Sequence, residues 1–244
     1  MTAHLQQNVK GRMNYWTVRT GLEQLGHTVL NCTSPYGPSR IEEGEIFYGN
    51  VNFINNVMER AGIKRRPSGF VPEVLRDFAP PFMVVSCDKA RKMHGKFLKP
   101  APTAQKAFQG FINDPNNQSE AMLNLAGYEG DVIVQAPMRY CSEWRIFILR
   151  GKIAACQHYR GDFRVSPSWS AIDEMMERAD LVEPKVPSWS MDVGIDYRHQ
   201  GNTWCIEVHD PFSLGAYGVQ PEILGAMLES AWEYEWEMKA RESE

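Results

Sequence analysis

The residues best suited to chemistry are acidic side chains on two neighbouring segments near the C-terminus. Apolar residues alternate along 191–197 and again along 203–209, a pattern typical of the two strands of a hairpin. A four-residue loop between them would place Asp192 directly opposite Glu207, with His209 on the same polar face. Two carboxylates in that position repel each other unless a cation offsets the repulsion, and Mg²⁺ prefers oxygen ligands. The hairpin therefore predicts a metal site.

The residues alone leave alternatives open at this hairpin. A shifted register would make the acidic positions an ordinary solvent-facing strand face. His209 and Asp210 extend the acidic end, and each is either a further ligand or a group that holds a ligand by a hydrogen bond. His209 is also consistent with a surface histidine.

A single arginine inside an apolar strand is the next candidate. Arg145 lies within an otherwise aromatic and aliphatic stretch, and a buried arginine requires an anion, either a carboxylate or a phosphate. A two-residue turn at Arg150-Gly151 predicts a hairpin with Arg145 opposite Cys156 and Glu143 opposite His158. The alternative is a structural ion pair between Glu143 and Arg145.

Positive charge is concentrated in the segment 89–106, although the whole chain carries a formal net charge of −4. The segment contains no Asp or Glu, and its basic residues are Lys89, Arg91, Lys92, Lys96, Lys99 and Lys106. This local reversal of charge suits an anionic ligand. A second basic run, Lys64–Arg66, is better explained as a solvated loop at a helix exit than as a nucleic-acid contact, because the protein is acidic overall.

The elements that would position these candidate residues form an α/β region followed by an α+β region. The predicted helices are 14–26, 51–62, a short polar one after 86, 171–179 and 221–241. The predicted strands are 28–30, 45–49, a buried one at 82–85, 95–100, 132–134, 143–149, 152–159, 191–197 and 203–209. The first twelve residues do not predict a strand. The residue pattern changes near Ser86, and the apolar strand at 132–134 ends at Ala136-Pro137, so we predict lobe boundaries at these two points.

Composition excludes several classes of protein. No stretch approaches the roughly 20 apolar residues of a membrane-spanning helix, so we expect no membrane partner. Five widely spaced cysteines without a Cys-x-x-Cys pair argue against a disulfide framework and against a zinc site. The N-terminus carries no secretory signal, which predicts a cytoplasmic location.

Five short motifs in order resemble the ATP-grasp superfamily. They are Lys99-Pro100, Lys106–Gly110, Ser142–Ile148, Asp192–Asp196 and Ile206–Gly218. More narrowly, they resemble a divergent clade frequent in phages and bacteria, which is related to a eukaryotic cell-division-cycle protein that assembles a translation initiation factor. The resemblance implies an ATP-grasp fold, in which an N-terminal α/β pre-domain (1–86) precedes two α+β lobes (87–136 and 137–244) that clasp the nucleotide.

The resemblance also implies roles for residues around the nucleotide. Lys99 would contact the phosphates of ATP, and Lys106 would lie in a mobile segment that covers them. Gln135 and Ala136 would form the hinge whose backbone meets adenine. Arg145 would face phosphate or acyl-phosphate oxygens, so that Arg145 and Lys99 would be the catalytic residues.

The metal positions implied by the resemblance are Asp192, Glu207 and His209, which would hold Mg²⁺. Relatives usually have Asn where this chain has His209, and nitrogen is a poorer match than oxygen for this hard ion. Asp210 is the substitute ligand if His209 does not serve. Pre-domains of this type usually open with a strand, which the first twelve residues here do not predict.

The function implied by the resemblance is that of a ligase that uses ATP and Mg²⁺ to join a carboxylate to an amine through an acyl phosphate. Its substrates would be small molecules or protein or peptide groups. The alternative is an ATP-binding assembly or regulatory module with altered catalysis, which the substitution at His209 motivates. Nucleic-acid binding ranks below both, because aromatic residues at this density are more often part of a core.

Overall fold

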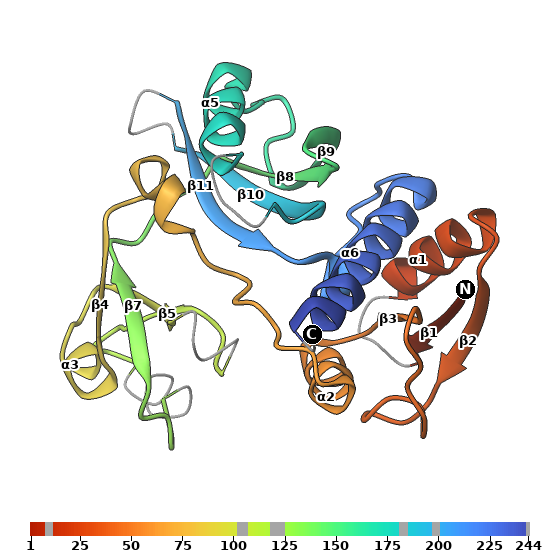
Figure 1. Cartoon of the computed structure of the whole chain (residues 1–244). Coiled ribbons are helices and arrows are strands. Elements are labelled where there is room, and N and C mark those ends of the chain that lie inside the picture. Colours follow the sequence, from red (N-terminus) through yellow and green to blue (C-terminus); the bar gives the residue numbers. More distant parts are fainter. Residues whose placement is uncertain (8–11, 102–106, 118–124, 181–184, 197–200, 243–244) are drawn as a thin grey trace.

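The computed structural model describes residues 1–7, 12–101, 107–117, 125–180, 185–196 and 201–242, and its strands form three separate sheets (Figure 1). The first sheet has three parallel strands, and the other two have four antiparallel strands each. This is the predicted order, an α/β unit followed by α+β units. No helix in these ranges is both long and apolar enough to cross a membrane.

The first sheet has the order β2–β1–β3, with β1 (Thr2–Gln6) between β2 (Thr28–Cys32) and β3 (Ile46–Tyr48). The expectation that the first twelve residues contain no strand is therefore wrong. The first strand of the chain is instead the centre of the parallel sheet.

Two polar side chains in β1 explain why its sequence does not look like a central strand. Both His4 and Gln6 are buried, but each has a polar partner. The Nε2 atom of His4 lies 2.9 Å from Oε1 of Glu45, and Oε1 of Gln6 accepts a hydrogen bond from the backbone N–H of Asn50. The partners come from segments about forty residues away, so tertiary contacts stabilise a strand that its own residue types do not indicate.

Helices α1 (Arg12–Gln24) and α2 (Val51–Ala61) belong to the same unit. The side chain of Asn50 caps α2 by accepting a hydrogen bond from the N–H of Phe53 at 2.9 Å. Gly62 ends the helix with a φ of 70°, a left-handed conformation that favours glycine, as the sequence predicts.

The closing helix α6 (Pro221–Glu242) packs along α1 and completes this unit (Figure 1). The buried Trp232 of α6 donates its indole N–H to the backbone oxygen of Phe47 in β3. The two helices are in close contact at Gly21, where an added Cβ would lie 1.9 Å from the backbone oxygen of Pro221.

We expect Gly21→Ala to lower the free energy of unfolding by about 1–3 kcal/mol, because the new methyl group must push α1 away from α6. Alanine is otherwise the better helix former by about 1 kcal/mol, so a loss would identify the clash as the cause. Urea unfolding measures the effect. Thr20→Ala, at an exposed position of the same helix, is the control and should not lose stability.

The second sheet is built from the middle of the chain. Its members are β4 (Phe82–Ser86), β5 (Phe97–Pro100), β6 (Phe111–Ile112) and β7 (Asp131–Gln135), in the order β4–β7–β5–β6, with helix α3 (Cys87–Arg91) after β4. The strand expected to be buried at 82–85 is an edge strand, with Met83 and Val84 each 50% exposed. Because β4 pairs with β7, this sheet begins before the boundary proposed at residue 86.

The third sheet has the order β11–β10–β8–β9. Its strands are β8 (Ser142–Leu149), β9 (Lys152–Gly161), β10 (Ser188–Asp196) and β11 (Asn202–His209). Helix α5 (Trp169–Ala179) packs on one face, where Ile172 and Met175 join a buried apolar cluster with Met191. On the other face Phe147 joins the cluster of α6 and the first sheet. The proposed lobes 1–86, 87–136 and 137–244 follow the order of the three sheets, except that β4 belongs to the second sheet and α6 packs on the first unit, and they remain a proposal.

Candidate functional site

The β10–β11 hairpin brings the predicted acidic residues together. Asp192 pairs with Glu207 in the predicted register. A bulge directly after Asp192 then shifts the pairing by one residue, so that Val193 faces Cys205. Cys205, which the alternation places on the polar face, is fully buried in the apolar cluster under α5 instead.

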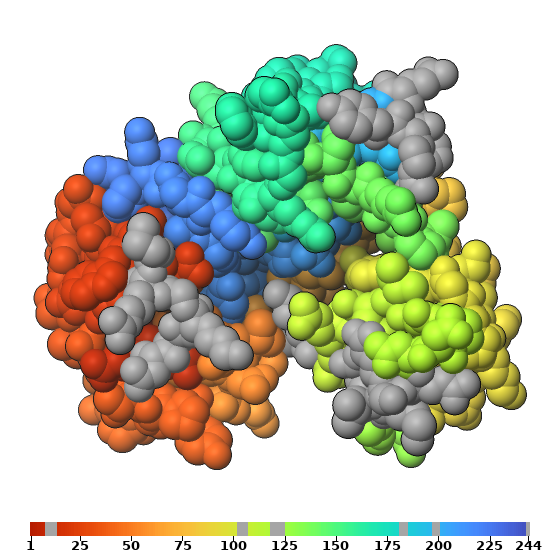
Figure 2. All heavy atoms as spheres, turned by 180° about the vertical axis from the view of Figure 1, so that it is seen from behind, coloured from red at the N-terminus to blue at the C-terminus, as the bar shows by residue number. Residues whose placement is uncertain are grey.

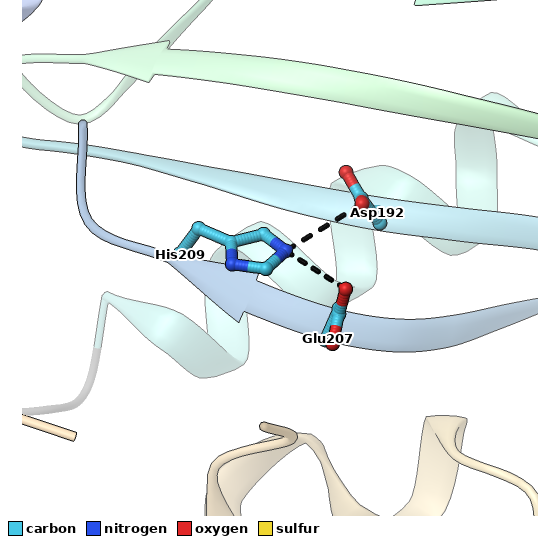
Figure 3. Close-up of side chains that lie close together, drawn as sticks. All are labelled: Asp192, Glu207 and His209. Atoms are coloured by element: carbon cyan, nitrogen blue, oxygen red, sulfur yellow. Dashed lines mark ion pairs between the residues drawn. The ribbon is translucent and has the colours of Figure 1, made fainter. Parts of the chain in front are cut away.

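Ligand atoms of Asp192, Glu207 and His209 converge, as Figure 3 shows, with one atom from each residue within 4.8 Å of the others. The Nε2 atom of His209 lies 3.0 Å from Oε1 of Glu207 and 3.6 Å from Oδ2 of Asp192. The histidine is 7% exposed. Although these distances are those of ion pairs, the buried Nε2 atom makes no hydrogen bond of acceptable geometry among the described residues.

This donor set fits a divalent cation. Two carboxylates and one imidazole face a common point, and the imidazole nitrogen lacks a well-aligned partner. Carboxylate oxygens suit Mg²⁺, and the imidazole nitrogen is the weakest match for this ion. Asp192, Glu207 and His209 are therefore the residues that would hold it.

Opposite charges in the cluster shift the pKa values of its members. Burial alone raises the pKa of Asp192, but the hydrogen bonds from Arg145 and the nearby imidazole of His209 outweigh burial, and the net pKa lies below its usual range. Burial alone lowers the pKa of His209, but its contacts with Asp192 and Glu207 outweigh burial and raise it. The two carboxylates thus attract positive charge, which is the property that a cation site requires.

Arg145 finds its anion in the same cluster. Its Nε and one terminal nitrogen donate to the two oxygens of Asp192, both at 2.7 Å, and its other terminal nitrogen donates to the backbone oxygen of Gly215 at 3.1 Å. The guanidinium also lies over the ring of Tyr217, 4.7 Å from the ring centre. Arg145 is 5% exposed, so this is a buried, bidentate ion pair.

The β8–β9 hairpin has the predicted turn but a different register. Leu149 pairs with Lys152 around the turn, whose two central residues have positive φ angles, as a two-residue hairpin turn requires. Two bulges then shift the strands, so that Arg145 faces Gln157 rather than Cys156, and Glu143 faces Arg160 rather than His158.

The alternative ion pair between Glu143 and Arg145 is not formed. Glu143 instead pairs with Arg160 at 3.2 Å and accepts a hydrogen bond from the hydroxyl of Tyr159 at 3.0 Å. The partner of Arg145 is the carboxylate of Asp192 on β10.

A cleft of about 890 Å³ lies between the second and third sheets. The space-filling view shows the surface hollowed between the yellow-to-green unit and the rest of the molecule (Figure 2). Lys99 and Gln135 line the cleft from the second sheet, and Glu143, Arg160 and Glu207 line it from the third. The Nζ atom of Lys99 is 3.9 Å from Oε2 of Glu207, so the two sheets meet across the cleft at a cation and a carboxylate.

The remaining members of the basic segment are arranged differently. Lys89, Arg91, Lys92 and Lys96 are exposed and do not line the cleft. Lys106 lies outside the described residues. Ala136 is exposed directly after β7, next to Gln135.

Arg65 has a role that its sequence context, a basic run expected to be a solvated loop, does not reveal. The side chain of Arg65 is 8% exposed and makes a bidentate ion pair with Asp210, the shortest contact being 2.9 Å. Arg66 pairs with Glu235 at 2.6 Å. The pair of Arg65 with Asp210 joins the segment after α2 to the residue that follows β11, and it occupies the carboxylate of Asp210, the substitute metal ligand. The pair of Arg66 with Glu235 joins the same segment to α6. The sequence did contain a signal that Asp210 has a structural role, because an Asp followed by a Pro is typical of a helix N-cap. In the structure Asp210 accepts a hydrogen bond from the N–H of Phe212.

Comparisons with known proteins agree with this architecture. A family model for ATP-grasp domains, which describes family 2 of one clade of these domains, matches residues 82–227, or 146 of the 244 residues. No curated protein matches.

Solved structures match along nearly the whole chain. D-cycloserine synthetase DcsG superposes with a TM-score of 0.58 at 12% identity, covering 96% of this chain and 99% of that one. D-alanine–D-alanine ligase from Bacillus anthracis superposes with a TM-score of 0.58 at 12% identity, covering 98% and 99%. The ATP-grasp ligase PsnB, complexed with minimal precursor, Mg and ADP, gives 0.50 at 14% identity, covering 96% and 97%. At these identities the matches show a shared fold.

Proposed function

The chain belongs to the ATP-grasp domains of clade family 2, and from this premise we propose that it is an ATP- and Mg²⁺-dependent ligase that joins a carboxylate to an amine. The observation that carries the proposal is the meeting of Lys99 with Glu207 across the cleft, at 3.9 Å. A phosphate-binding cation from one sheet and the acidic cluster of another then enclose the same space, as transfer of a phosphoryl group requires. The similar structures include ligases by name, D-alanine–D-alanine ligase and PsnB.

In this proposal each candidate residue has a separate task. Lys99 binds the phosphates, and the backbone of Gln135 and Ala136 at the end of β7 meets adenine. Arg145, held by Asp192, the backbone of Gly215 and the ring of Tyr217, supplies positive charge to the oxygens that become more negative during transfer. Lys106 is proposed to cover the phosphates.

Mg²⁺ held by Asp192, Glu207 and His209 would neutralise charge on the phosphate oxygens. The cluster itself orients those ligands, because Arg145 fixes the carboxylate of Asp192 through two hydrogen bonds.

The proposed reaction has two steps. An oxygen of the carboxylate attacks the γ-phosphorus of ATP, the bond from that phosphorus to the oxygen of ADP breaks, and an acyl phosphate forms. The amine nitrogen then attacks the acyl carbon, inorganic phosphate leaves with the carbon–oxygen electron pair, and the nitrogen loses a proton. Neither step needs a nucleophile from the protein, so positioning and charge are what the residues contribute.

We expect the purified protein to release one ADP and one phosphate per amide formed when it is given ATP, Mg²⁺ and a suitable acid and amine. Glu207→Gln should raise the Mg²⁺ concentration for half-maximal turnover on the order of 10–100-fold, because a charged ligand becomes neutral. Coupled ADP detection over a magnesium titration measures this, with the exposed Glu59→Gln as the control. An unchanged magnesium dependence in the Glu207→Gln variant would contradict the assigned metal site.

A second candidate is an ATP-binding assembly or regulatory module with altered catalysis. Two observations favour it: both oxygens of Asp192 are held by Arg145, and a histidine stands at position 209. The resemblance to the eukaryotic assembly protein points the same way. Nucleotide binding without ADP release across a broad panel of acids and amines would favour this candidate over the ligase.

A further inference from the structure

The segment 214–218, which follows β11, is fixed by two hydrogen bonds with the first unit. The backbone oxygen of Leu214 accepts a hydrogen bond from the buried hydroxyl of Tyr48 at 2.8 Å. The backbone N–H of Ala216 donates to Oδ1 of Asn14 at 3.0 Å. Leu214 and Ala216 are both buried. The residues that alternate with them are therefore carried on a backbone that is held in place.

The guanidinium of Arg145 is the group that this segment contacts. The backbone oxygen of Gly215 accepts a hydrogen bond from it at 3.1 Å, and the ring centre of Tyr217 lies 4.7 Å from its central carbon. A Cβ added at Gly215 would lie 3.4 Å from Nη1 of Arg145 and 3.3 Å from Cζ of Tyr217, so the glycine permits this close approach. The carbonyl and the ring thus hold one terminal nitrogen and one face of the guanidinium, while Asp192 holds its other two nitrogens.

The ring of Tyr217 is itself held by a second tyrosine. It stacks on Tyr159 of β9, with the ring centres 4.6 Å apart and the planes 16° apart. The hydroxyl of Tyr159 donates to Oε2 of Glu143 at 3.0 Å, which fixes the second ring in turn. Tyr159 is not among the described residues that line either the cleft or the cavity of about 210 Å³ beside Arg145. Any effect of Tyr159 on a ligand must therefore pass through the residues that it contacts.

Tyr217 adopts an unfavourable backbone conformation although its side chain is only partly buried. Its φ is 48°, which favours glycine and is rare for a residue with a side chain, and the residue is 44% exposed. Glycine at this position would remove the strain, and a half-exposed ring adds little to an apolar core. Strain of this kind is concentrated at functional sites. The contact with Arg145 is what the ring supplies and glycine would not.

The guanidinium of Arg145 keeps hydrogen-bond donors that the protein does not use. An arginine has five N–H groups in a rigid plane, and three of them have acceptors among the described residues, on Asp192 and Gly215. The other two are left for the oxygens of a ligand. Because the fork is planar, they meet those oxygens only when the plane has the correct orientation. A displacement of about 1 Å in such a group can lower a rate on the order of 10²-fold.

We propose that Tyr217 is a positioning residue supported by Tyr159. The stacked rings hold the plane of the guanidinium of Arg145, so that its two remaining N–H groups meet the phosphoryl group during transfer. Both tyrosines act through Arg145. The inference rests on the proposed function, because it assumes phosphoryl transfer from ATP at this site, and it adds two residues to those that the reaction requires.

The variants that test this proposal remove the ring and leave the charged cluster unchanged. Tyr217→Leu keeps a side chain on the strained backbone but has no aromatic face, whereas the conservative Tyr217→Phe keeps the ring. Tyr159→Leu removes the support from a position that lines neither cavity, and it serves if Tyr217→Leu does not fold. Tyr36→Leu, at a tyrosine that is 65% exposed in the first unit, is the control. Urea unfolding identifies the variants that fold.

Two measurements are made on each folded variant. The first is the affinity for ADP in Mg²⁺, with and without aluminium fluoride, because ADP with this anion mimics the phosphoryl group during transfer. The second is kcat and the KM for ATP, with an acid and an amine that stimulate ADP release by the wild-type protein. The first measurement needs no substrate other than the nucleotide.

We expect aluminium fluoride to raise the affinity of the wild-type protein for ADP on the order of 10²-fold, the lower end for such mimics. In Tyr217→Leu this gain should fall about tenfold or more, and in Tyr159→Leu about threefold or more, while the affinity for ADP alone stays within about twofold. The value of kcat should fall by the same factors with little change in the KM for ATP, since the interaction forms only in the transition state. Tyr217→Phe and Tyr36→Leu should keep the gain within about threefold.

Several results would overturn the inference and leave the ligase proposal standing. They are a wild-type protein without any gain from aluminium fluoride, a full gain in a folded leucine variant, and equal losses in Tyr217→Leu and Tyr217→Phe. A matching loss of affinity for ADP alone would also overturn it, because the ring would then act on binding rather than on transfer. Failure of every acid and amine to stimulate ADP release would instead reject the ligase function. If the gain from aluminium fluoride still depended on the ring, the positioning role would stand.

Discussion

Asp192→Asn is expected to lower the free energy of unfolding by about 3–5 kcal/mol and to reduce ligase turnover on the order of 10²–10³-fold. The first effect follows because the substitution leaves the guanidinium of Arg145 buried, at 5% exposure, without its anion. The second follows because the variant loses a charged member of the metal cluster and the group that orients Arg145. Urea unfolding measures the first effect, and steady-state turnover in saturating Mg²⁺ measures the second.

A double variant separates stability from catalysis. Replacing both charges, with Arg145→Met and Asp192→Leu, removes the buried ion pair and keeps an apolar filling of similar size, which is often neutral or stabilising. We expect it to be more stable than Asp192→Asn and equally inactive. Asp173→Asn, on the exposed side of α5, is the matched control and should change neither quantity. If Asp192→Asn kept full stability, the carboxylate of Asp192 could not be the anion that the buried Arg145 requires.

The acidic hairpin could be predicted because its pattern is local. Apolar residues alternate regularly along both strands. The pairs nearer the loop, such as Val193 with Cys205, are shifted by one residue from the predicted register, and the bulge restores that register at Asp192, so the pairing of Asp192 with Glu207 was correct. The bulge after Asp192 adds one residue to a strand, and no residue type there signals it. The same limit explains the β8–β9 hairpin, where the bulge between Phe147 and Ile148 moved the partner of Arg145 from Cys156 to Gln157.

Partners that are distant along the chain could not be predicted. Arg65 and Asp210 are separated by 145 positions, and their ion pair forms only once the segment after α2 runs past the end of β11. The sequence reveals the charge of Arg65 but not its burial, so a solvated loop was the natural expectation. Strand β1 was missed for a related reason, since the partners of its polar residues lie in another segment.

The basic segment 89–106 was predicted to face an anionic ligand, but among its described basic residues only Lys99 lines the cleft. Within the described part of 89–106, the exposed lysines and arginine lie outside the cleft, while Lys99 lies inside it and is 16% exposed. Strand alternation accounts for this, because Leu98 is fully buried in the core of the second sheet and its neighbour Lys99 must point to the other side. The charge pattern therefore indicates the basic segment, and the orientation of β5 determines that Lys99 is the basic side chain that enters the cleft.

Lys99→Met is expected to weaken ATP binding about 10–100-fold with little change in stability. A hydrogen bond to a charged phosphate contributes about 1.5–3 kcal/mol, and each 1.4 kcal/mol is a factor of ten in affinity. The contact of Lys99 with Glu207, at 3.9 Å, is at the limit of an ion pair, so its loss should cost the folded protein at most about 1 kcal/mol. Isothermal titration calorimetry with a non-hydrolysable ATP analogue measures the affinity, and urea unfolding measures the stability.

Lys96→Met is the matched control, because it removes the same charge from an exposed position just before the same strand. An equal loss of affinity in both variants would mean that the general positive field of the segment attracts the nucleotide. Loss in Lys99→Met alone requires direct contact, and added salt should then weaken binding more in the wild-type protein than in this variant. Full affinity without Lys99 would place the phosphates elsewhere, and the meeting of Lys99 with Glu207 could no longer support the ligase proposal.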